Sequence, residues 1–205
     1  MAKLAVFASG TGSNFAAIAD FLMRHTGDTD KHQLVCLVTD RLDAKVVSKS
    51  VSRNIPVVAV RYTSRFAAES TLLKELEKYQ PDLIALAGFM RLLSPEFVDR
   101  YPNRIVNLHP SLLPRHAGLN AIQQSYAAGD SELGITIHYV DHGLDTGPVI
   151  LQRSFSRNDE DTQADIEGRI HTLEHEHYPR VVQKLLDTID AQRNGIDAKQ
   201  TDRED

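Results

Sequence analysis

Ile105-Val106-Asn107-Leu108-His109-Pro110-Ser111-Leu112-Leu113-Pro114 is the stretch around which the rest of the chain is organised. Its apolar β-formers predict a buried strand, and its two prolines end regular structure. Asn107 and His109 are two residues apart, so on an extended backbone their side chains point to the same side. An amide donor held beside an imidazole suits acyl transfer. A polar strand end followed by a proline-rich loop is the alternative interpretation.

The start of the chain has the pattern of a strand, a glycine turn and a helix. Residues 3–8 predict a buried strand, and residues 15–24 predict a helix. The turn Gly10-Thr11-Gly12-Ser13-Asn14 would offer backbone N–H groups to a phosphate at the helix N-terminus. Phe15 stands where the dinucleotide fingerprint has Gly or Ala, and the turn lacks the Gly-Lys-Ser/Thr of a Walker A loop. We therefore expect a single phosphate, although many such turns use glycine only for geometry.

Strands and helices alternate through the rest of the chain. Further strands are predicted at residues 34–38, 57–60, 82–87, 104–109, 135–140 and 149–152. Helices are predicted at residues 44–53, 65–79, 121–128 and 162–189, with a short one from Ser94 and a break near Tyr178-Pro179 in the last. This alternation predicts an α/β fold, a doubly wound, mostly parallel Rossmann-like sheet with a small antiparallel addition toward the C-terminus. Ligands of such sheets lie beyond the carboxyl ends of the strands. There the turn 9–14, Asn107 with His109, and Asp145 would meet.

The composition indicates one domain. The chain has 205 residues, 41% of them hydrophobic and 25% charged. We expect a single domain over residues 1–189. Residues 190–205 are polar and are predicted to be disordered.

Charge and cysteine content exclude several classes of protein. The formal net charge is −5 without a long basic run, so nucleic acid is not an expected partner. Cys36 is the only cysteine, which excludes an internal disulfide and a Cys-based zinc site and fits a cytoplasmic location. The apolar runs are too short for a signal peptide or a membrane span.

Four motifs resemble the phosphoribosylglycinamide formyltransferase family, whose members have the formyltransferase fold. They are Ala-Ser-Gly-Thr-Gly-Ser-Asn (8–14), Leu-Ala-Gly-Phe-Met-Arg-Leu-Leu-Ser-Pro (86–95), Asn-Leu-His-Pro-Ser-Leu-Leu-Pro (107–114) and the Asp145 loop (140–150). Glu174-His175 with Tyr178-Pro179 is a weaker match. The resemblance implies transfer of a formyl group from 10-formyltetrahydrofolate to the amine of glycinamide ribonucleotide in purine synthesis, without a metal.

The resemblance also divides the expected domain into a phosphate-binding half at 1–100 and a catalytic and folate-binding half at 101–189, and it assigns residues to roles. Asn107, His109 and Asp145 match the catalytic trio: Asn107 and protonated His109 would donate to the oxyanion, while Asp145 would orient the imidazole and help relay the amine's proton. The substrate phosphate and ribose would meet Gly10, Thr11, Gly12, Ser13, Asn14, Arg65 and Glu174. The folate would meet Phe89, Met90, Arg91, Leu92, Leu93, Val140, Asp141, His142, Gly143 and Leu144. The expected partners are small molecules, and a homodimer is an open alternative to a monomer.

Three positions depart from the family pattern. Proline and histidine usually stand where Ala117 and Asn120 stand here, which bears on the shape of the substrate loop but not on the trio. Asp40 stands where asparagine is common. It also lies where a dinucleotide site would have its ribose-binding acid, but with Phe15 in the first turn we interpret it as a solvated loop carboxylate.

Three other functions compete with this interpretation. Formyltetrahydrofolate hydrolysis would use the same trio with water as acceptor, but that branch typically has an N-terminal regulatory domain, and here a strand is expected from Lys3. Methionyl-tRNA formylation is disfavoured by the acidic charge and by the absence of an added C-terminal domain. A zinc hydrolase is the most distant alternative: His171-Thr172-Leu173-Glu174-His175 fits the pattern H-x-x-E-H, but the resemblance assigns Glu174 to the ribose.

Overall fold

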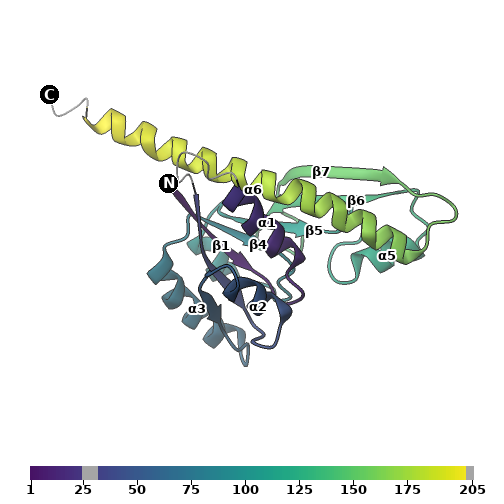
Figure 1. Ribbon diagram of the computed structural model, residues 1–205, viewed down its shortest axis with the longest axis horizontal. Helices are drawn as coiled ribbons and strands as arrows, with labels where there is room; N and C mark the ends of the chain where they lie inside the picture. The colour runs from purple at the N-terminus through teal and green to yellow at the C-terminus, as the bar shows by residue number, and fades with distance from the viewer. Residues whose placement is uncertain (25–31, 202–205) are drawn as a thin grey trace.

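The computed structural model describes residues 1–24 and 32–201, and within them a seven-stranded sheet carries helices on both faces (Figure 1). The strand order is β3-β2-β1-β4-β5-β6-β7. Strands β1 to β5 pair in parallel, whereas β6 pairs antiparallel with both β5 and β7. The strands are β1 (Ala2–Phe7), β2 (His32–Thr39), β3 (Val57–Ala59), β4 (Leu83–Leu86), β5 (Ile105–His109), β6 (Glu132–Tyr139) and β7 (Val149–Ser156). The predicted fold class is confirmed.

Helices bury the central strands on both sides. They are α1 (Ser13–Arg24), α2 (Lys45–Val51), α3 (Arg65–Tyr79), α4 (Pro95–Arg100), α5 (Ala121–Ala127) and α6 (Gln163–Thr201). Side chains of α1, α2, α5 and α6 pack on one face of the sheet, and those of α3 and α4 pack on the other. In β1, Leu4 and Val6 belong to the first core and Ala5 and Phe7 to the second. This double burial explains why β1 is a continuous apolar run rather than an alternating one.

The winding of the chain determines where a ligand can bind. From β1 the chain moves outward through β2 and β3, then returns to place β4 and β5 on the other side of β1. This reversal separates the turn after β1 from the segment after β4 and leaves a crevice at the carboxyl ends of the strands. The antiparallel β6 brings its own residues there, since Asn107 pairs with His138 and His109 with Thr136.

Helix α6 is continuous through Pro179, so the break that we considered near Tyr178-Pro179 is absent from it. Tyr178 is fully buried, and its hydroxyl donates to the carbonyl oxygens of Leu86 (2.9 Å) and Val106 (3.2 Å). These bonds anchor the helix to β4 and β5 at the residue beside the proline. These tertiary contacts therefore offset the backbone hydrogen bond that is lost because proline has no N–H.

The last helix ends later in the chain than the sequence predicts. Helix α6 continues through Thr201, well past residue 190, and residues 202–205 lie outside the described part. Arg193 forms a two-pronged ion pair with the buried Asp82, and Asp190 pairs with the amino group of Met1. Composition alone does not reveal these two partners, which lie at the start of β4 and at the start of the chain. Within residues 1–24 and 32–201, no helix is long and apolar enough to cross a membrane.

Candidate active site

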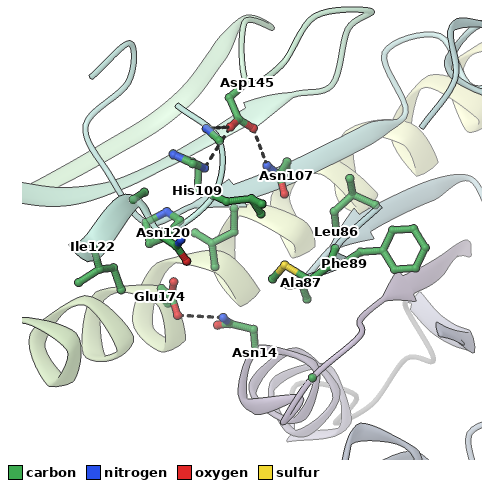
Figure 2. Close-up of a pocket in the computed structure, with 18 of the residues that line it drawn as sticks. Asn14, Leu86, Ala87, Phe89, Asn107, His109, Asn120, Ile122, Asp145 and Glu174 are labelled. Carbon is green, nitrogen blue, oxygen red and sulfur yellow. Dashed lines mark hydrogen bonds and ion pairs between the residues drawn. The ribbon is translucent and has the colours of Figure 1, made fainter. Parts of the chain in front are cut away.

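A cavity of about 790 Å³ lies beyond the carboxyl ends of β1, β4 and β5 (Figure 2). The sequence-predicted site residues that line it are Gly10, Thr11, Gly12, Ser13, Asn14, Phe89, Met90, Arg91, Leu92, Leu93, Asn107, His109, Val140, Asp141, Gly143, Leu144, Asp145 and Glu174. The described residues that line the cavity do not include Arg65 or His142. Arg65 is exposed at the start of α3, and the His142 ring turns outward to the Asp99 carboxylate at 2.9 Å.

Asp145 is the centre of the polar cluster. Its backbone has a φ of 55°, in the left-handed region that aspartate tolerates better than most residues. Its Oδ2 accepts from the Gly118 N–H at 2.8 Å and lies 3.3 Å from His109 Nδ1. Burial alone would raise the pKa of this carboxyl. The His138 side chain, the Gly118 N–H and the nearby His109 nevertheless lower the pKa overall, below its ordinary value of 3.8. Asp145 is therefore an anion at neutral pH.

His109 is buried between two acceptors. Its Nδ1 faces Asp145, and its Nε2 lies 2.9 Å from the carbonyl oxygen of His116. A carbonyl and an ionised carboxylate can only accept hydrogen bonds, so His109 satisfies both only when both of its ring nitrogens carry protons. The geometry thus favours the imidazolium form that the sequence analysis assigns to this residue.

His138 belongs to the cluster but was not among the predicted site residues. Its Nδ1 lies 2.8 Å from the carbonyl oxygen of Tyr139 and therefore carries a proton. Its Nε2 lies 3.2 Å from the Asn107 amide nitrogen and 3.6 Å from Asp145 Oδ1, and the Asn107 nitrogen itself donates to Asp145 Oδ1 at 3.3 Å. The amide nitrogen of Asn107 is thus engaged on the side of Asp145, and its oxygen points away from it (Figure 2).

The turn after β1 forms the opposite end of the cavity. Gly12 has a φ of 71°, and a Cβ there would lie 2.4 Å from Val46 Cγ2, so only glycine fits. The N–H of Ala16 donates to the Gly12 carbonyl at 3.1 Å, and the preceding amides come before the first intrahelical bond of α1. Those amides, at the positive end of a helix, are suited to bind a phosphate.

Glu174 connects this turn to α6. Its Oε2 accepts from the Asn14 amide nitrogen and from His171 Nδ1, both at 2.9 Å (Figure 2). The His171 and His175 rings stack, with centroids 6.2 Å apart. Across residues 1–24 and 32–201, no three His, Cys, Asp or Glu side chains are grouped as ligands of one metal ion. The H-x-x-E-H segment therefore forms a hydrogen-bonded network that includes Asn14.

The segment after β4 forms an apolar wall. Met90 and Leu92 are largely exposed, which leaves them free to contact a ligand. The Ser9 N–H donates to the Gly88 carbonyl at 3.1 Å, and the Met90 N–H donates to Ser9 Oγ at 3.1 Å. The wall is thus tied to the turn after β1. Asn120, one of the departures from the family pattern, also lines the cavity.

The site combines a glycine turn at a helix N-terminus, an apolar wall, and a carboxylate with two imidazoles and an amide. On a doubly wound sheet, these features define an α/β enzyme equipped for acyl-group transfer. Residues 2–182 match the model of the family described as formyl transferase. The chain belongs to this family.

Similar proteins carry a more specific name. The chain is 43% identical to phosphoribosylglycinamide formyltransferase of Bacillus subtilis, over 91% of this chain and 95% of that protein. It is 37% identical to the Escherichia coli protein of the same name, over 90% of this chain and 87% of that protein. The crystal structure of glycinamide ribonucleotide transformylase 1 from Geobacillus kaustophilus has a TM-score of 0.85 and 48% identity, over 91% of this chain and 99% of that chain.

Proposed function

We propose that this protein transfers the formyl group of 10-formyltetrahydrofolate to the amine of glycinamide ribonucleotide in de novo purine synthesis. The observation that carries the proposal is the convergence of Asn107, His109 and Asp145 on the cavity that also holds the Gly10–Asn14 turn. The phosphate and the amine of one nucleotide would occupy the two ends of this cavity. The names of the similar bacterial proteins support this choice of substrate.

The reaction requires protons to be held and moved at defined atoms. The amine nitrogen attacks the formyl carbon, and the carbonyl oxygen gains negative charge. Charged His109 is the donor to this oxyanion, and the Asp145 carboxylate holds the imidazole and its second proton. The carbon–nitrogen bond to the folate then breaks, and the amine's proton passes to the folate nitrogen with the help of Asp145.

One hydrogen bond must be exchanged for this step. Both nitrogens of His109 already face acceptors, namely Asp145 and the His116 carbonyl. The amide nitrogen of Asn107 is likewise engaged by Asp145 and His138. Donation to a formyl oxygen therefore requires the substrates to displace the His116 carbonyl or to turn the Asn107 amide. Catalytic hydrogen bonds are often incomplete in a free enzyme and form only when the substrates bind.

The remaining contacts follow from the two ends of the cavity. The turn amides would hold the phosphate, Glu174 would accept from the ribose hydroxyls, and the folate would lie between the Phe89–Leu93 wall and the loop at 140–145. The exposed Arg65 lies outside this cavity and is proposed only as a long-range attractor of anions. A cytoplasmic location and a homodimer remain predictions of the sequence analysis.

The test is a folate absorbance assay. We mix the protein with 10-formyltetrahydrofolate and measure deformylation with and without glycinamide ribonucleotide. Deformylation that requires the nucleotide, and that His109→Ala abolishes, supports the transferase. Deformylation at the same rate without the nucleotide would instead identify a hydrolase.

A further inference from the structure

Asp40 is a buried carboxylate and not the solvated one that the sequence predicted. It follows the last residue of β2, and its side chain is 2% exposed. Its Oδ2 accepts from Arg91 Nε at 2.6 Å. Its Oδ1 is buried and has no hydrogen-bond partner among the described residues. Asp40 therefore has one strong interaction, and that interaction is with a residue of the cavity wall.

Arg91 connects Asp40 to the cavity. Its side chain is 45% exposed and lines the cavity, and its guanidinium lies 5.4 Å from the centre of the Tyr62 ring. Tyr62 in turn packs edge-on against Phe89, with ring centroids 5.9 Å apart. The Asp40 carboxylate, the Arg91 guanidinium and the rings of Tyr62 and Phe89 thus form one chain of contacts.

Stability alone does not account for this carboxylate. A buried charge costs free energy unless its hydrogen bonds are complete, and Asp40 has one oxygen without a partner within residues 1–24 and 32–201. An asparagine would fill the same space at a lower desolvation cost. What the carboxylate adds is a charge-assisted bond that orients Arg91.

The wall has other attachments on both sides of Arg91. Before Arg91, Phe89 packs on Phe7 with ring centroids 5.3 Å apart, and Ser9 bonds to Gly88 and to the Met90 N–H at 3.1 Å. After Arg91, the side chain of Leu93 is buried in the core. The side chain of Arg91 lies between these attachments, and Asp40 is the acidic group that holds it. Removal of the Asp40 charge should therefore loosen the wall at Arg91 and leave its two ends in place.

We propose that Asp40 is a positioning residue for the side of the cavity that binds the formyl donor. Its buried carboxylate holds Arg91, and Arg91 in turn holds the Phe89–Leu93 wall in the geometry that the folate contacts. The proposal rests on the proposed function, because it takes the ligand of this wall to be a folate. Asp40 itself touches no substrate.

The first test is Asp40→Asn, which keeps the shape of the side chain and removes its charge. The KM for 10-formyltetrahydrofolate should rise about five-fold, the scale of a half-exposed charge-assisted bond. The kcat, the KM for glycinamide ribonucleotide and the thermal midpoint should not fall. The matched control is Asp43→Asn, whose carboxylate pairs with Arg41 at 3.1 Å on the surface and does not line the cavity. This control should leave kcat, both KM values and the thermal midpoint unchanged.

The second test asks whether Asp40 acts through Arg91. If it does, Arg91→Gln and the double variant Asp40→Asn/Arg91→Gln have the same folate KM. An unchanged folate KM in Asp40→Asn, multiplicative effects in the double variant, or a lower thermal midpoint as the only change would overturn the proposal. Calorimetric titration with 10-formyltetrahydrofolate distinguishes a failure of the proposed function from a failure of the role proposed for Asp40. Wild-type protein that binds the folate but lacks nucleotide-dependent transfer would refute the proposed function, and its folate Kd would still test Asp40.

Discussion

At the scale of single residues, the site depends on how the charge of His109 is maintained. Asp145 and the His116 carbonyl face the two ring nitrogens, and Asp145 is itself kept ionised by the donors around it. The same arrangement occupies both ring nitrogens of His109 until a substrate displaces one acceptor. The charge of His109 and its availability to a substrate are thus controlled by the same hydrogen bonds.

The activity should fall as the pH rises above neutral. The pKa of Asp145 is lowered below 3.8, so this carboxyl stays ionised through the neutral and alkaline range and cannot cause the decrease. A decrease would therefore come from the imidazole of His109, which the mechanism needs in its charged form. Initial rates from about pH 6 to pH 9 measure it. A flat profile would count against charged His109.

His138 should affect the chemical step more than binding. Its Nε2 lies 3.2 Å from the Asn107 amide nitrogen and 3.6 Å from Asp145 Oδ1, while its Nδ1 donates to the Tyr139 carbonyl oxygen. We expect His138→Ala to lower kcat about ten-fold and to change both KM values little, as for the loss of one supporting group of a catalytic cluster. His177→Ala, on α6 and not among the cavity-lining residues, is the control. Equal effects of the two variants would remove His138 from the site.

At the scale of elements, the turn after β1 depends on one glycine. Gly12 directly precedes α1, where the phosphate is expected. Gly12→Ala would place a Cβ against the side chain of Val46 in α2. We expect the KM for glycinamide ribonucleotide to rise at least ten-fold and the protein to lose about 2 kcal/mol of stability. Gly129→Ala is the matched control, since Gly129 has the same φ of 71° with open space around it and lies outside the cavity. That variant should lose about 1 kcal/mol and keep its KM. An unchanged KM in Gly12→Ala would contradict the phosphate role of the turn.

The elements themselves were predictable because the apolar pattern is strong. Each predicted strand and helix is present, and the turn after β1, Asn107 with His109, and Asp145 meet at the cavity, as the rule that ligands bind at the carboxyl ends of strands predicts. Three features were not predictable, and each depends on a partner far away in the sequence. His138 joins the site through the antiparallel pairing of β5 with β6, Asp40 is buried by Arg91, and α6 continues because Arg193 reaches Asp82. Periodicity gives no information on such partners.

At the scale of the whole molecule, we propose that residues 1–189 form the functional domain and that the rest of α6 serves stability. Residues 190–194, the part of this segment whose side chains the structure describes, do not line the cavity, whereas Arg193 neutralises Asp82, which is 4% exposed. A chain ending at residue 189 should lose about 1–2 kcal/mol, since a buried carboxylate loses its ion-pair partner. Its kcat should be unchanged at low temperature.

Chemical denaturation compares this shortened chain with full-length Arg193→Gln. If the ion pair explains the loss, the point variant reproduces most of it. A shortened chain with full stability would show that α6 beyond residue 189 is dispensable. A shortened chain that is folded but inactive would instead extend the functional domain beyond residue 189.

One experiment tests most directly whether the protein transfers a formyl group to a nucleotide amine at His109. The protein is incubated with glycinamide ribonucleotide and 10-formyltetrahydrofolate labelled with ¹³C in the formyl group, and the products are analysed by mass spectrometry. We expect the label on the amine of the nucleotide with wild-type protein, and no labelled nucleotide with His109→Ala. Label released as free formate, or labelled nucleotide formed equally well by His109→Ala, would contradict it.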